Sequence, residues 1–341
     1  MAPALPSLPP EPYGGVMETT MPLTIMPVPG AGAEDVLVGP DGRVWTGTVD
    51  GAVIAVTPDG RQSERVVETG GRPLGLEWLP DGRLLVCDAS RGLLAVDVDG
   101  SRAIEELVTE VDGSPMVFTN NAAVAADGTI WFSDSSRQWG VEVWKSDLIE
   151  HTRSGRLLRR AVDGTVTTVL DGLAFANGVA LLPDESAVLV AETALRRIRR
   201  VELSGGLPVA GHVVGSEGSD VEPSAEQLFV AGLPGYPDNI SRGSDGLIWS
   251  AIASPPDPVL NVLQASPQRL RDLALRLPEA IKPTPKRTVR VIAHDATGTL
   301  VHDLSADATG WHMATGVREQ DGRVWLGSLV EPAIAHFELP R

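Results

Sequence analysis

The sequence contains a single cysteine, Cys87, among 341 residues. An internal disulfide is therefore excluded, and the scarcity of cysteine predicts a reducing, cytoplasmic location. The chain also has no run of about 18 consecutive apolar residues, so no transmembrane helix is expected. Residues 1–29 show no basic patch followed by an apolar stretch, and we expect no secretory signal there.

Basic residues are scarce relative to acidic ones, with 28 Lys and Arg against 45 Asp and Glu and a formal charge of −17. Because nucleic-acid affinity comes largely from cations that neutralise phosphates, this balance argues against DNA or RNA binding. Hydrophobic residues make up 43% of the chain, which is enough for a buried core. We expect a folded monomer or homodimer that binds a small-molecule substrate, with no nucleic-acid and no membrane partner.

One hairpin pattern recurs six times along the chain: an alternating apolar stretch, a polar turn and a second alternating stretch. Its turns are Asp41-Gly42, Asp81-Gly82, Asp127-Gly128, Asp184-Glu185, Asp245-Gly246 and Asp321-Gly322. Asp-Gly is a strong signal for a two-residue hairpin turn. About four strands fit each repeat, so the pattern predicts an all-β fold, a six-bladed β-propeller.

The propeller is expected to form a single domain over residues 29–341. Residues 1–28 would form a proline-rich N-terminal extension that wraps the outside and contributes an outer strand closing the ring. Inside the domain, Trp45, Trp131, Trp249 and Trp325 each follow a turn aspartate by four residues. Large rings at one repeated position predict packing between neighbouring blades.

The largest departure from the repeat is an insertion at about residues 254–286, in the fifth blade. Its apolar spacing and flanking prolines predict one or two short amphipathic helices. Such an insertion would lie over one face of the propeller. Two roles remain open, either a lid or wall of a substrate pocket, or a capping or oligomer-contact segment.

Equivalent positions in the repeat should meet at one depth of the central channel, because the innermost strands of a propeller surround it. Seven residues before each turn aspartate stand Glu34, Leu74, Asn120, Asn177, Asp238 and Ala314. Carboxylate and amide oxygens suit a hard divalent cation such as calcium, and no His or Cys is present to favour zinc or copper. Each residue alone also fits a turn-capping role, but four equivalent oxygen-bearing positions predict a shared metal site.

The positions six residues before the turn aspartates supply further oxygens. Asn239 is a candidate fifth ligand at the predicted site. Asp35 and Asn121 are candidates for a second, buried cation site. That second site would have only one carboxylate, which is little negative charge for an enclosed cation.

Several segments carry a resemblance to a known superfamily. They are RPLGLEWLPDG at Arg72, FTNNAAVAADGTIWFSDSS at Phe118, HTRSGRLLRR at His151, TTVLDGLAFANGVALLPDESAVLVAET at Thr167, LPGYPDNISRGSDGLIW at Leu233 and DGRVWLGSL at Asp321. Over roughly residues 33–341 the sequence resembles the calcium-dependent six-bladed propellers that include SMP-30/gluconolactonases (regucalcin), paraoxonases and diisopropylfluorophosphatase. It is most similar to their strictosidine-synthase-like branch. The resemblance is more specific for fold than for chemistry, because this fold hosts several reactions.

The resemblance implies a catalytic Ca²⁺, or another divalent cation, held by Glu34, Asn120, Asn177 and Asp238, with Asn239 as a further ligand as in paraoxonases. It also implies that Asp238 acts as a base or a nucleophile. Strictosidine synthase lacks the full metal set and uses a late Glu. The matching region here offers His312 instead, which favours hydrolysis. His312 is a candidate proton shuttle or a hydrogen-bonded structural residue.

Two departures from these relatives bear on the substrate. Leu74 stands where paraoxonases place a His over the metal, and residues 112–118 (DGSPMVF) lack the Arg with which gluconolactonases bind a sugar. We therefore expect a more apolar substrate than a sugar lactone. Besides Leu74, the candidate pocket residues, each also typical of a packing position, are Met116, Trp139, Trp144, Phe175, Tyr236 and Trp311.

These features together predict a calcium-dependent hydrolase of a lactone or aryl ester, in which the metal polarises the carbonyl group. Two alternatives remain open. One is a carbon–nitrogen bond-forming or bond-cleaving enzyme of the strictosidine-synthase type, and the other is a non-enzymatic propeller with structural calcium. If catalysis requires the metal, this would distinguish the hydrolase hypothesis from both alternatives.

Overall fold

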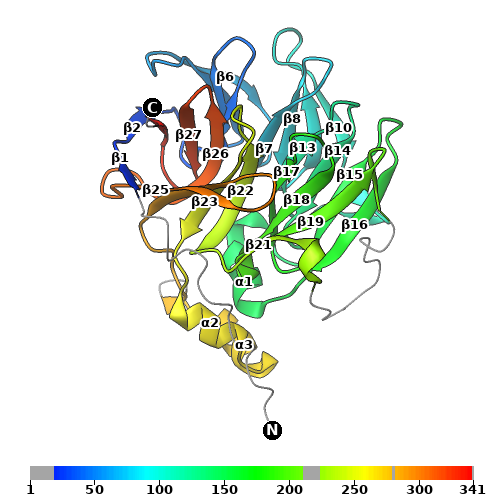
Figure 1. The fold of residues 1–341 in the computed structure, drawn as a ribbon, viewed down its shortest axis with the longest axis vertical. Helices are drawn as coiled ribbons and strands as arrows, with labels where there is room; N and C mark the ends of the chain where they lie inside the picture. The colour runs from blue at the N-terminus through cyan, green and yellow to red at the C-terminus, as the bar shows by residue number, and fades with distance from the viewer. Residues whose placement is uncertain (1–18, 210–222, 279–280, 340–341) are drawn as a thin grey trace.

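The computed structural model describes residues 19–209, 223–278 and 281–339. Six sheets of four or five strands follow one another in chain order around a central axis (Figure 1). This arrangement confirms the six-bladed propeller predicted from the hairpin repeat.

Each blade is a sheet whose strands run antiparallel in chain order from the channel outwards. Blade one comprises β3 (Leu37–Val38), β4 (Val44–Gly47), β5 (Ala52–Val56) and β6 (Ser63–Glu68). Blade two comprises β7 (Pro73–Trp78), β8 (Leu84–Asp88), β9 (Gly92–Val96) and β10 (Ile104–Val108). Blade three comprises β13 (Thr119–Val124), β14 (Ile130–Asp134), β15 (Gly155–Arg160) and β16 (Val166–Leu173).

The second half of the chain continues the same order. Blade four comprises β17 (Ala176–Leu181), β18 (Ala187–Glu192), β19 (Arg197–Ser204), β20 (Leu207–Pro208) and β21 (Leu228–Ala231). Blade five comprises β22 (Tyr236–Arg242), β23 (Ile248–Ser254), β24 (Val289–His294) and β25 (Leu300–Ala306). Blade six comprises β26 (Ala314–Gln320), β27 (Arg323–Ser328) and β28 (Ala333–Glu338).

Two strands near the N-terminus complete the outer edges of the last blades. β2 (Thr24–Pro27) pairs antiparallel with β28, and β1 (Thr19–Met21) pairs in parallel with β25. The N-terminal part of the chain thus supplies the fourth strand of blade six, which fastens the two ends of the propeller together. The first strands of blades two to six contact one another in order, β4 of blade one contacts β7, and β26 contacts β3, so the ring is closed.

The hairpin turns differ in detail from the two-residue form that the Asp-Gly dipeptides predict. In blade one, Gly39 and Arg43 pair around a three-residue loop, and Gly42 takes φ +80°. This is a type I turn followed by a left-handed glycine, which adds one residue to the loop. The aspartate is selected because its carboxylate accepts the backbone N–H two residues on, as from Arg43 to Asp41.

The hairpins of blades two, three and five follow the three-residue form, while blade four has a longer loop. In blade six, Asp321 and Gly322 both have positive φ and Gln320 pairs directly with Arg323. That hairpin is the only one of the six with the two-residue turn.

The four repeated tryptophans are buried, with at most 3% of their surface exposed. Trp45 packs with residues of both blade one and blade two, including Leu76 and Val86. Trp131 likewise packs against Val179 and Val190 of blade four. The predicted role of these rings in the packing between blades is confirmed.

Three short helices lie together on one side of the propeller (Figure 1). α1 (Trp144–Glu150) follows the 3-10 turn η1 (Val141–Val143) between β14 and β15. α2 (Pro258–Gln264) and α3 (Gln268–Leu275) interrupt blade five between β23 and β24, as the insertion predicts. α1 has no counterpart among the predictions, because seven residues are too few for a helical period to stand out.

The remaining elements are small. A two-stranded hairpin, β11 (Glu110–Val111) and β12 (Ser114–Pro115), separates blades two and three, and 3-10 turns form at η2 (Thr193–Leu195) and η3 (Ala225–Gln227). In the residues that the structure describes, no helix has the length and apolar character to span a membrane.

Candidate metal centre

The predicted metal positions lie where the first strands of the blades bulge. In blades two to six, pairing between the first and second strands shifts register at this depth, for example between Thr119 and Ala122. A regular strand alternates its side chains between two faces, and a bulge breaks that alternation. Two consecutive residues, such as Asn120 and Asn121, are therefore both free to make contacts across the blades.

Four predicted ligands line one cavity, and we call them the cavity ring: Glu34, Asn120, Asn177 and Asp238. Asp238 is half-buried, whereas the other three expose at most 4% of their surface. The remaining predicted ligand, Asn239, is buried beside the ring and donates from Nδ2 to Glu34 Oε1 at 3.1 Å. The structure thus brings the whole predicted ligand set together.

The ring and the adjacent Asn239 contain side-chain oxygens that have no hydrogen-bond partner within the described part of the chain. They are Glu34 Oε2, Asn120 Oδ1, Asn177 Oδ1 and Asn239 Oδ1. Buried polar atoms in folded proteins almost always have a partner, because an unpaired one loses its hydration without compensation. Four such oxygens at one depth are the donor set that a calcium ion prefers.

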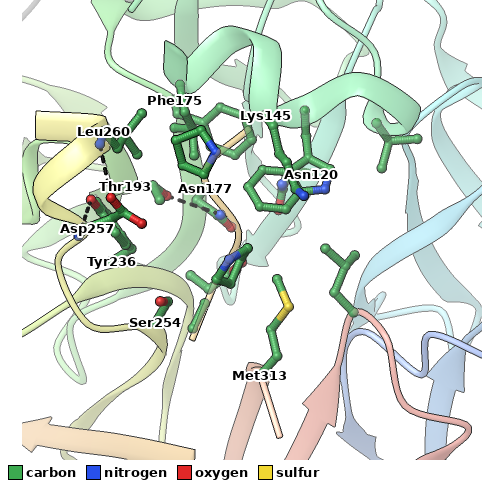
Figure 2. Close-up of a pocket in the computed structure, with 18 of the residues that line it drawn as sticks. Asn120, Lys145, Phe175, Asn177, Thr193, Tyr236, Ser254, Asp257, Leu260 and Met313 are labelled. Atoms are coloured by element: carbon green, nitrogen blue, oxygen red, sulfur yellow. Dashed lines mark hydrogen bonds between the residues drawn. The ribbon is translucent and has the colours of Figure 1, made fainter. Parts of the chain in front are cut away.

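Two hydroxyl groups fix which end of each amide faces the cavity. Asn120 Nδ2 donates to Ser135 Oγ at 3.0 Å, and Asn177 Nδ2 donates to Thr193 Oγ1 at 3.2 Å. Figure 2 shows the second of these bonds as a dashed line on the cavity wall. With the nitrogens occupied, both amide oxygens are left for a cation. Ser135 and Thr193 each follow the last residue of the second strand of their blade.

Neither hydroxyl residue was identified from the sequence as a functional residue. The same repeat could have revealed them, since Ser135 and Thr193 stand 15 and 16 residues after their asparagines. To recognise these partners, the alignment of the repeats must be extended to the end of the second strand of each blade.

The side chains next along the chain behave differently. Asp35 Oδ2 accepts the backbone N–H of Leu76 at 2.9 Å, and Asn121 Oδ1 accepts that of Val179, also at 2.9 Å. Each bond joins one blade to the next, and we call Asp35 and Asn121 the staple pair. These contacts give the two residues a role in inter-blade hydrogen bonding, and a second cation site at Asp35 and Asn121 stays a prediction.

The cavity ring concentrates negative charge. Burial raises the pKa of Asp238 to about 7, although a hydrogen bond from Asn177 offsets part of the effect. Burial, with the neighbouring charges of Asp35 and Asp238, also raises the pKa of Glu34 well above its usual range. Arg72 opposes this shift without removing it. A bound cation would supply the missing positive charge and favour both carboxylates in their ionised forms.

The donor set fits a hard cation better than a transition metal. None of the cavity-ring residues is a histidine or a cysteine, the ligands that favour transition metals. The cavity ring instead pairs two carboxylates with two amides. That combination matches calcium, which accepts carbonyl oxygens readily.

Apolar side chains surround the ring in a cavity of about 850 Å³ of empty space, part of which is open to solvent. Its walls come from the ends of the inner strands and from the helices: Leu74, Phe118, Phe175, Tyr236, Met313 and Leu329, with Trp144, Leu148, Ile149 and Leu260 above them. Figure 2 shows Leu260 and Asp257 entering from the helical insertion, across the cavity from Met313. The insertion is therefore part of the pocket wall.

The structure places the predicted pocket residues in two groups. Leu74, Phe175 and Tyr236 line the cavity, as does Trp144. The others do not. Met116 and Trp311 are buried in packing clusters between blades, where Trp311 Nε1 donates to Ala333 O. Trp139 Nε1 donates to Glu150 at the end of α1.

His312 also lies outside the residues that line the cavity. Its two ring nitrogens face Glu331 and Arg287, and the neighbouring Met313 takes the place on the cavity wall. Met313 has a positive φ of +56°, so the chain turns sharply at this point. The placement supports the structural alternative for His312, a histidine held by hydrogen bonds.

Family comparisons agree with this site and fold. The model of the SMP-30/gluconolactonase/LRE-like region matches residues 49–284, more than two thirds of the chain. The chain belongs to the SMP-30/gluconolactonase/LRE-like family. A model of the strictosidine synthase-like N-terminal region also matches residues 23–60, so this family member has features of both groups, as the resemblance implied.

Two relatives illustrate the range of the family. The adipocyte plasma membrane-associated protein of Homo sapiens is 32% identical over 90% of this chain and 76% of its own length. The strictosidine synthase-like protein 6 of Arabidopsis thaliana is 31% identical over 90% of this chain and 78% of its own.

Solved structures of two similar proteins share the propeller. A gluconolactonase from Xanthomonas campestris superposes with a TM-score of 0.64 at 18% identity, covering 93% of this chain and 89% of that one. Regucalcin from Agrobacterium tumefaciens, described as a calcium-binding protein, superposes with a TM-score of 0.63 at 15% identity, covering 95% and 96%. At these identities the likeness establishes the fold.

Proposed function

We propose that this family member is a calcium-dependent hydrolase of lactones or esters that carry an apolar group. The observation that carries the proposal is the set of unpaired, buried oxygens of Glu34, Asn120 and Asn177 in the wall of an apolar cavity, with that of Asn239 beside them. The described relatives include lactonase-like and calcium-binding propellers. Another divalent cation of similar hardness would satisfy the same donors.

A divalent cation bound there would supply a Lewis acid for the substrate carbonyl oxygen and for the charge that develops on it. Glu34, Asn120, Asn177, Asp238 and Asn239 would hold it. Ser135 and Thr193 would keep the amide oxygens directed at it. Fixed donors of this kind need no reorganisation during the reaction, which is the main source of electrostatic catalysis.

Asp238 is the ring residue best placed to react, because it alone is only half-buried and opens onto the cavity. It would either take a proton from the attacking water or attack the carbonyl carbon itself. A single turnover in ¹⁸O-labelled water distinguishes general-base catalysis from direct attack. Only direct attack leaves the label in the Asp238 carboxylate, where mass spectrometry of the protein would detect it.

The apolar walls would select the substrate and exclude bulk water. Leu74, Phe118 and Phe175 offer hydrophobic contact and no donor for a sugar hydroxyl. Lys145 is the one basic side chain among the described residues that line the cavity. We therefore expect a preference for long-chain or aryl lactones and esters over sugar lactones.

The first experiment is an assay of the purified protein on aryl esters, γ- and δ-lactones and a phosphotriester, with calcium and with excess chelator. Turnover that disappears with chelator and returns with calcium supports the proposal and ranks the substrate classes. A melting temperature that falls with chelator, without turnover on any substrate, would leave calcium with a structural role and overturn the hydrolase assignment.

A second candidate rests on the strictosidine synthase-like relatives, which are 31–34% identical. In that case the cavity would accommodate an amine and an aldehyde for carbon–nitrogen bond formation. Full activity on such a pair in the presence of chelator would favour it over hydrolysis.

A further inference from the structure

The two helices of the insertion are apolar on their inner sides. Leu260 of α2 and Ala274 of α3 are buried against the cavity wall, and Leu263 and Leu275 pack half-buried beside them. Gln264 Nε2 adds a hydrogen bond to the carbonyl of Leu148 in α1, at 2.9 Å. These contacts account for the attachment of the insertion to the propeller.

The same helices are also apolar on their outer sides. Val259 and Val262 of α2 expose 59% and 67% of their surface. Leu270 and Leu273 of α3, with Leu277 just beyond it, expose 52%, 59% and 41%. The spacings of three and seven residues place side chains on one stripe of each helix. A surface helix normally needs only its inner stripe to be apolar, so the outer stripe requires another explanation.

Exposed apolar side chains are concentrated here. Six of the 14 large hydrophobic residues that are exposed in the described chain belong to the insertion, including Ile281 at 66%. We call Val259, Val262, Leu270, Leu273, Leu277 and Ile281 the outer apolar face. Exposed apolar side chains gathered on one segment of a protein surface mark interaction sites.

The charge of the insertion is opposite to that of the protein. Residues 255–288 contain six Lys and Arg against three Asp and Glu, in a chain whose net charge is −17. Arg269 and Arg276 are exposed on or next to α3, and Lys286 is exposed further along, whereas Arg287 donates to the carbonyls of Ala308 and Thr309. Two copies of a positively charged face would repel each other, whereas an anionic surface would attract it.

We propose that the outer apolar face docks on the surface of an anionic lipid membrane. Apolar residues would enter the boundary between headgroups and acyl chains, and the surrounding basic residues would pair with lipid phosphates and carboxylates. With seven and eight residues, the helices are too short to cross a bilayer and would lie in its interface. The sequence-based expectation of no membrane partner rested on the absence of a long apolar run, a criterion that does not detect short interfacial helices.

Docking in this orientation would place the cavity next to the lipid. α2 supplies Leu260 to the cavity wall, and Pro283, Thr284 and Pro285 line it from the chain that returns to β24. In Figure 1 the two helices project from the propeller beneath α1. An apolar compound dissolved in the membrane could then reach the cavity without crossing much water.

The test is flotation of the full-length protein with vesicles of phosphatidylcholine alone and of phosphatidylcholine with phosphatidylserine. We expect binding to the anionic vesicles that weakens as salt is raised. Val262→Asp and Arg276→Glu should each reduce this binding at least about tenfold. Neither residue lines the cavity, so hydrolysis of a water-soluble aryl ester should be unchanged in both variants, which separates this test from the proposed function.

The chain offers matched controls for both substitutions. Val162, in the turn between β15 and β16, is 66% exposed, and the Arg61 side chain is 84% exposed on blade one. Val162→Asp and Arg61→Glu should leave vesicle binding within about twofold. The proposal is overturned if the wild-type protein does not float with either vesicle, or if the control variants weaken binding as much. A wild-type dimer that Val262→Asp converts to monomers, without vesicle binding, would instead assign the face to a second copy of the chain.

Discussion

The cavity ring and the staple pair differ although their members are adjacent in the sequence. Glu34 and Asn120 leave oxygens without a protein partner, whereas Asp35 and Asn121 each accept a backbone N–H from the next blade. The same residue types, one position apart, therefore have opposite roles. One set is arranged for a ligand, and the other holds the blades together.

The glycines around the staple pair show how closely the blades approach. A Cβ on Gly178 would lie 2.1 Å from the backbone nitrogen of Ile240 in blade five. Gly75 and Gly316 would meet Asn121 and Asp35 in the same way. Every second blade thus presents a glycine to a polar residue of the blade that follows. A side chain at any of these glycines would collide with the backbone of the next blade, so glycine is required for the blades to approach this closely.

The largest effect is expected from a change at the reactive position of the cavity ring. Asp238→Asn should lower kcat by a factor on the order of 1,000 or more, because the base or nucleophile is lost. Its amide can still coordinate a cation, although the lost carboxylate charge should lower calcium affinity by a factor on the order of 100. Steady-state kinetics and calorimetric titration with calcium would measure the two effects. Hydrolysis at near the wild-type rate, with calcium still bound, would remove Asp238 from the mechanism.

A second change tests the charge of the ring. Glu34→Gln should weaken calcium binding by a factor on the order of 100, because carboxylate charge sets affinity at such sites. The calcium-free variant should be no less stable than the calcium-free wild type, since a buried carboxyl with few cationic neighbours is replaced by a neutral group. Titration calorimetry and denaturant unfolding in chelator give both values. Unchanged calcium affinity would contradict the ligand assignment.

At the staple pair we expect a loss of stability without a large loss of calcium affinity. Asn121→Ala should lower the free energy of unfolding by about 2 kcal/mol, because the backbone N–H of Val179 loses its buried acceptor. Calcium affinity should change by less than about threefold if the variant is folded. Urea unfolding with and without calcium would measure this. A large loss of calcium affinity with normal stability would mean that the two sets share one function.

A smaller effect tests the orientation of the amides. Thr193→Val should lower calcium affinity by roughly tenfold, as is typical when a partner of a metal ligand is removed. The Asn177 amide would then be free to turn its nitrogen toward the cavity. Thr193→Ser keeps the hydroxyl and serves as the matched control, so it should bind calcium nearly as the wild type does. Equal losses in both variants would indicate a packing effect instead.

A pH-dependent effect concerns a group outside both sets. Burial lowers the pKa of His294, on the third strand of blade five, to about 4. In the unfolded chain His takes up its proton near pH 6.5, so its contribution to stability is present above that pH and is lost as the pH falls toward 4.

The expected slope is at most about 1.4 kcal/mol per pH unit over that window. Unfolding measured at several pH values, with calcium and with chelator, should show this component in both conditions. His294→Gln should reduce the slope. A slope that the substitution leaves unchanged would point to other buried groups, such as His151, whose pKa burial also lowers to about 4.

The regular features of the molecule could be predicted from the sequence. The hairpin repeat indicated six blades, and the distance to each turn aspartate selected the four residues of the cavity ring. Both inferences succeed because equivalent positions of a propeller must lie at equal depth. The insertion was also recognisable, since its proline borders and helical spacing interrupt the strand pattern.

Features that depend on contacts across blades could not be predicted in this way. The sequence does not distinguish Asn120 from Asn121, because the bulge that frees both side chains arises in the pairing of two strands. Nor does it exclude Met116 and Trp311 from the cavity, since an aromatic or apolar side chain fits a core and a pocket equally well.

The sequence by itself determined the repeat, the blade number and the chemical types at each depth, because these follow from periodicity and residue chemistry. Only the tertiary structure decided which oxygens remain unpaired, which side chains staple the blades, and which face of the helical insertion is left in solvent. Those outcomes depend on distances between residues far apart in the chain, such as the bond from Asn239 to Glu34. Local sequence carries no information on such distances until the blades are packed together.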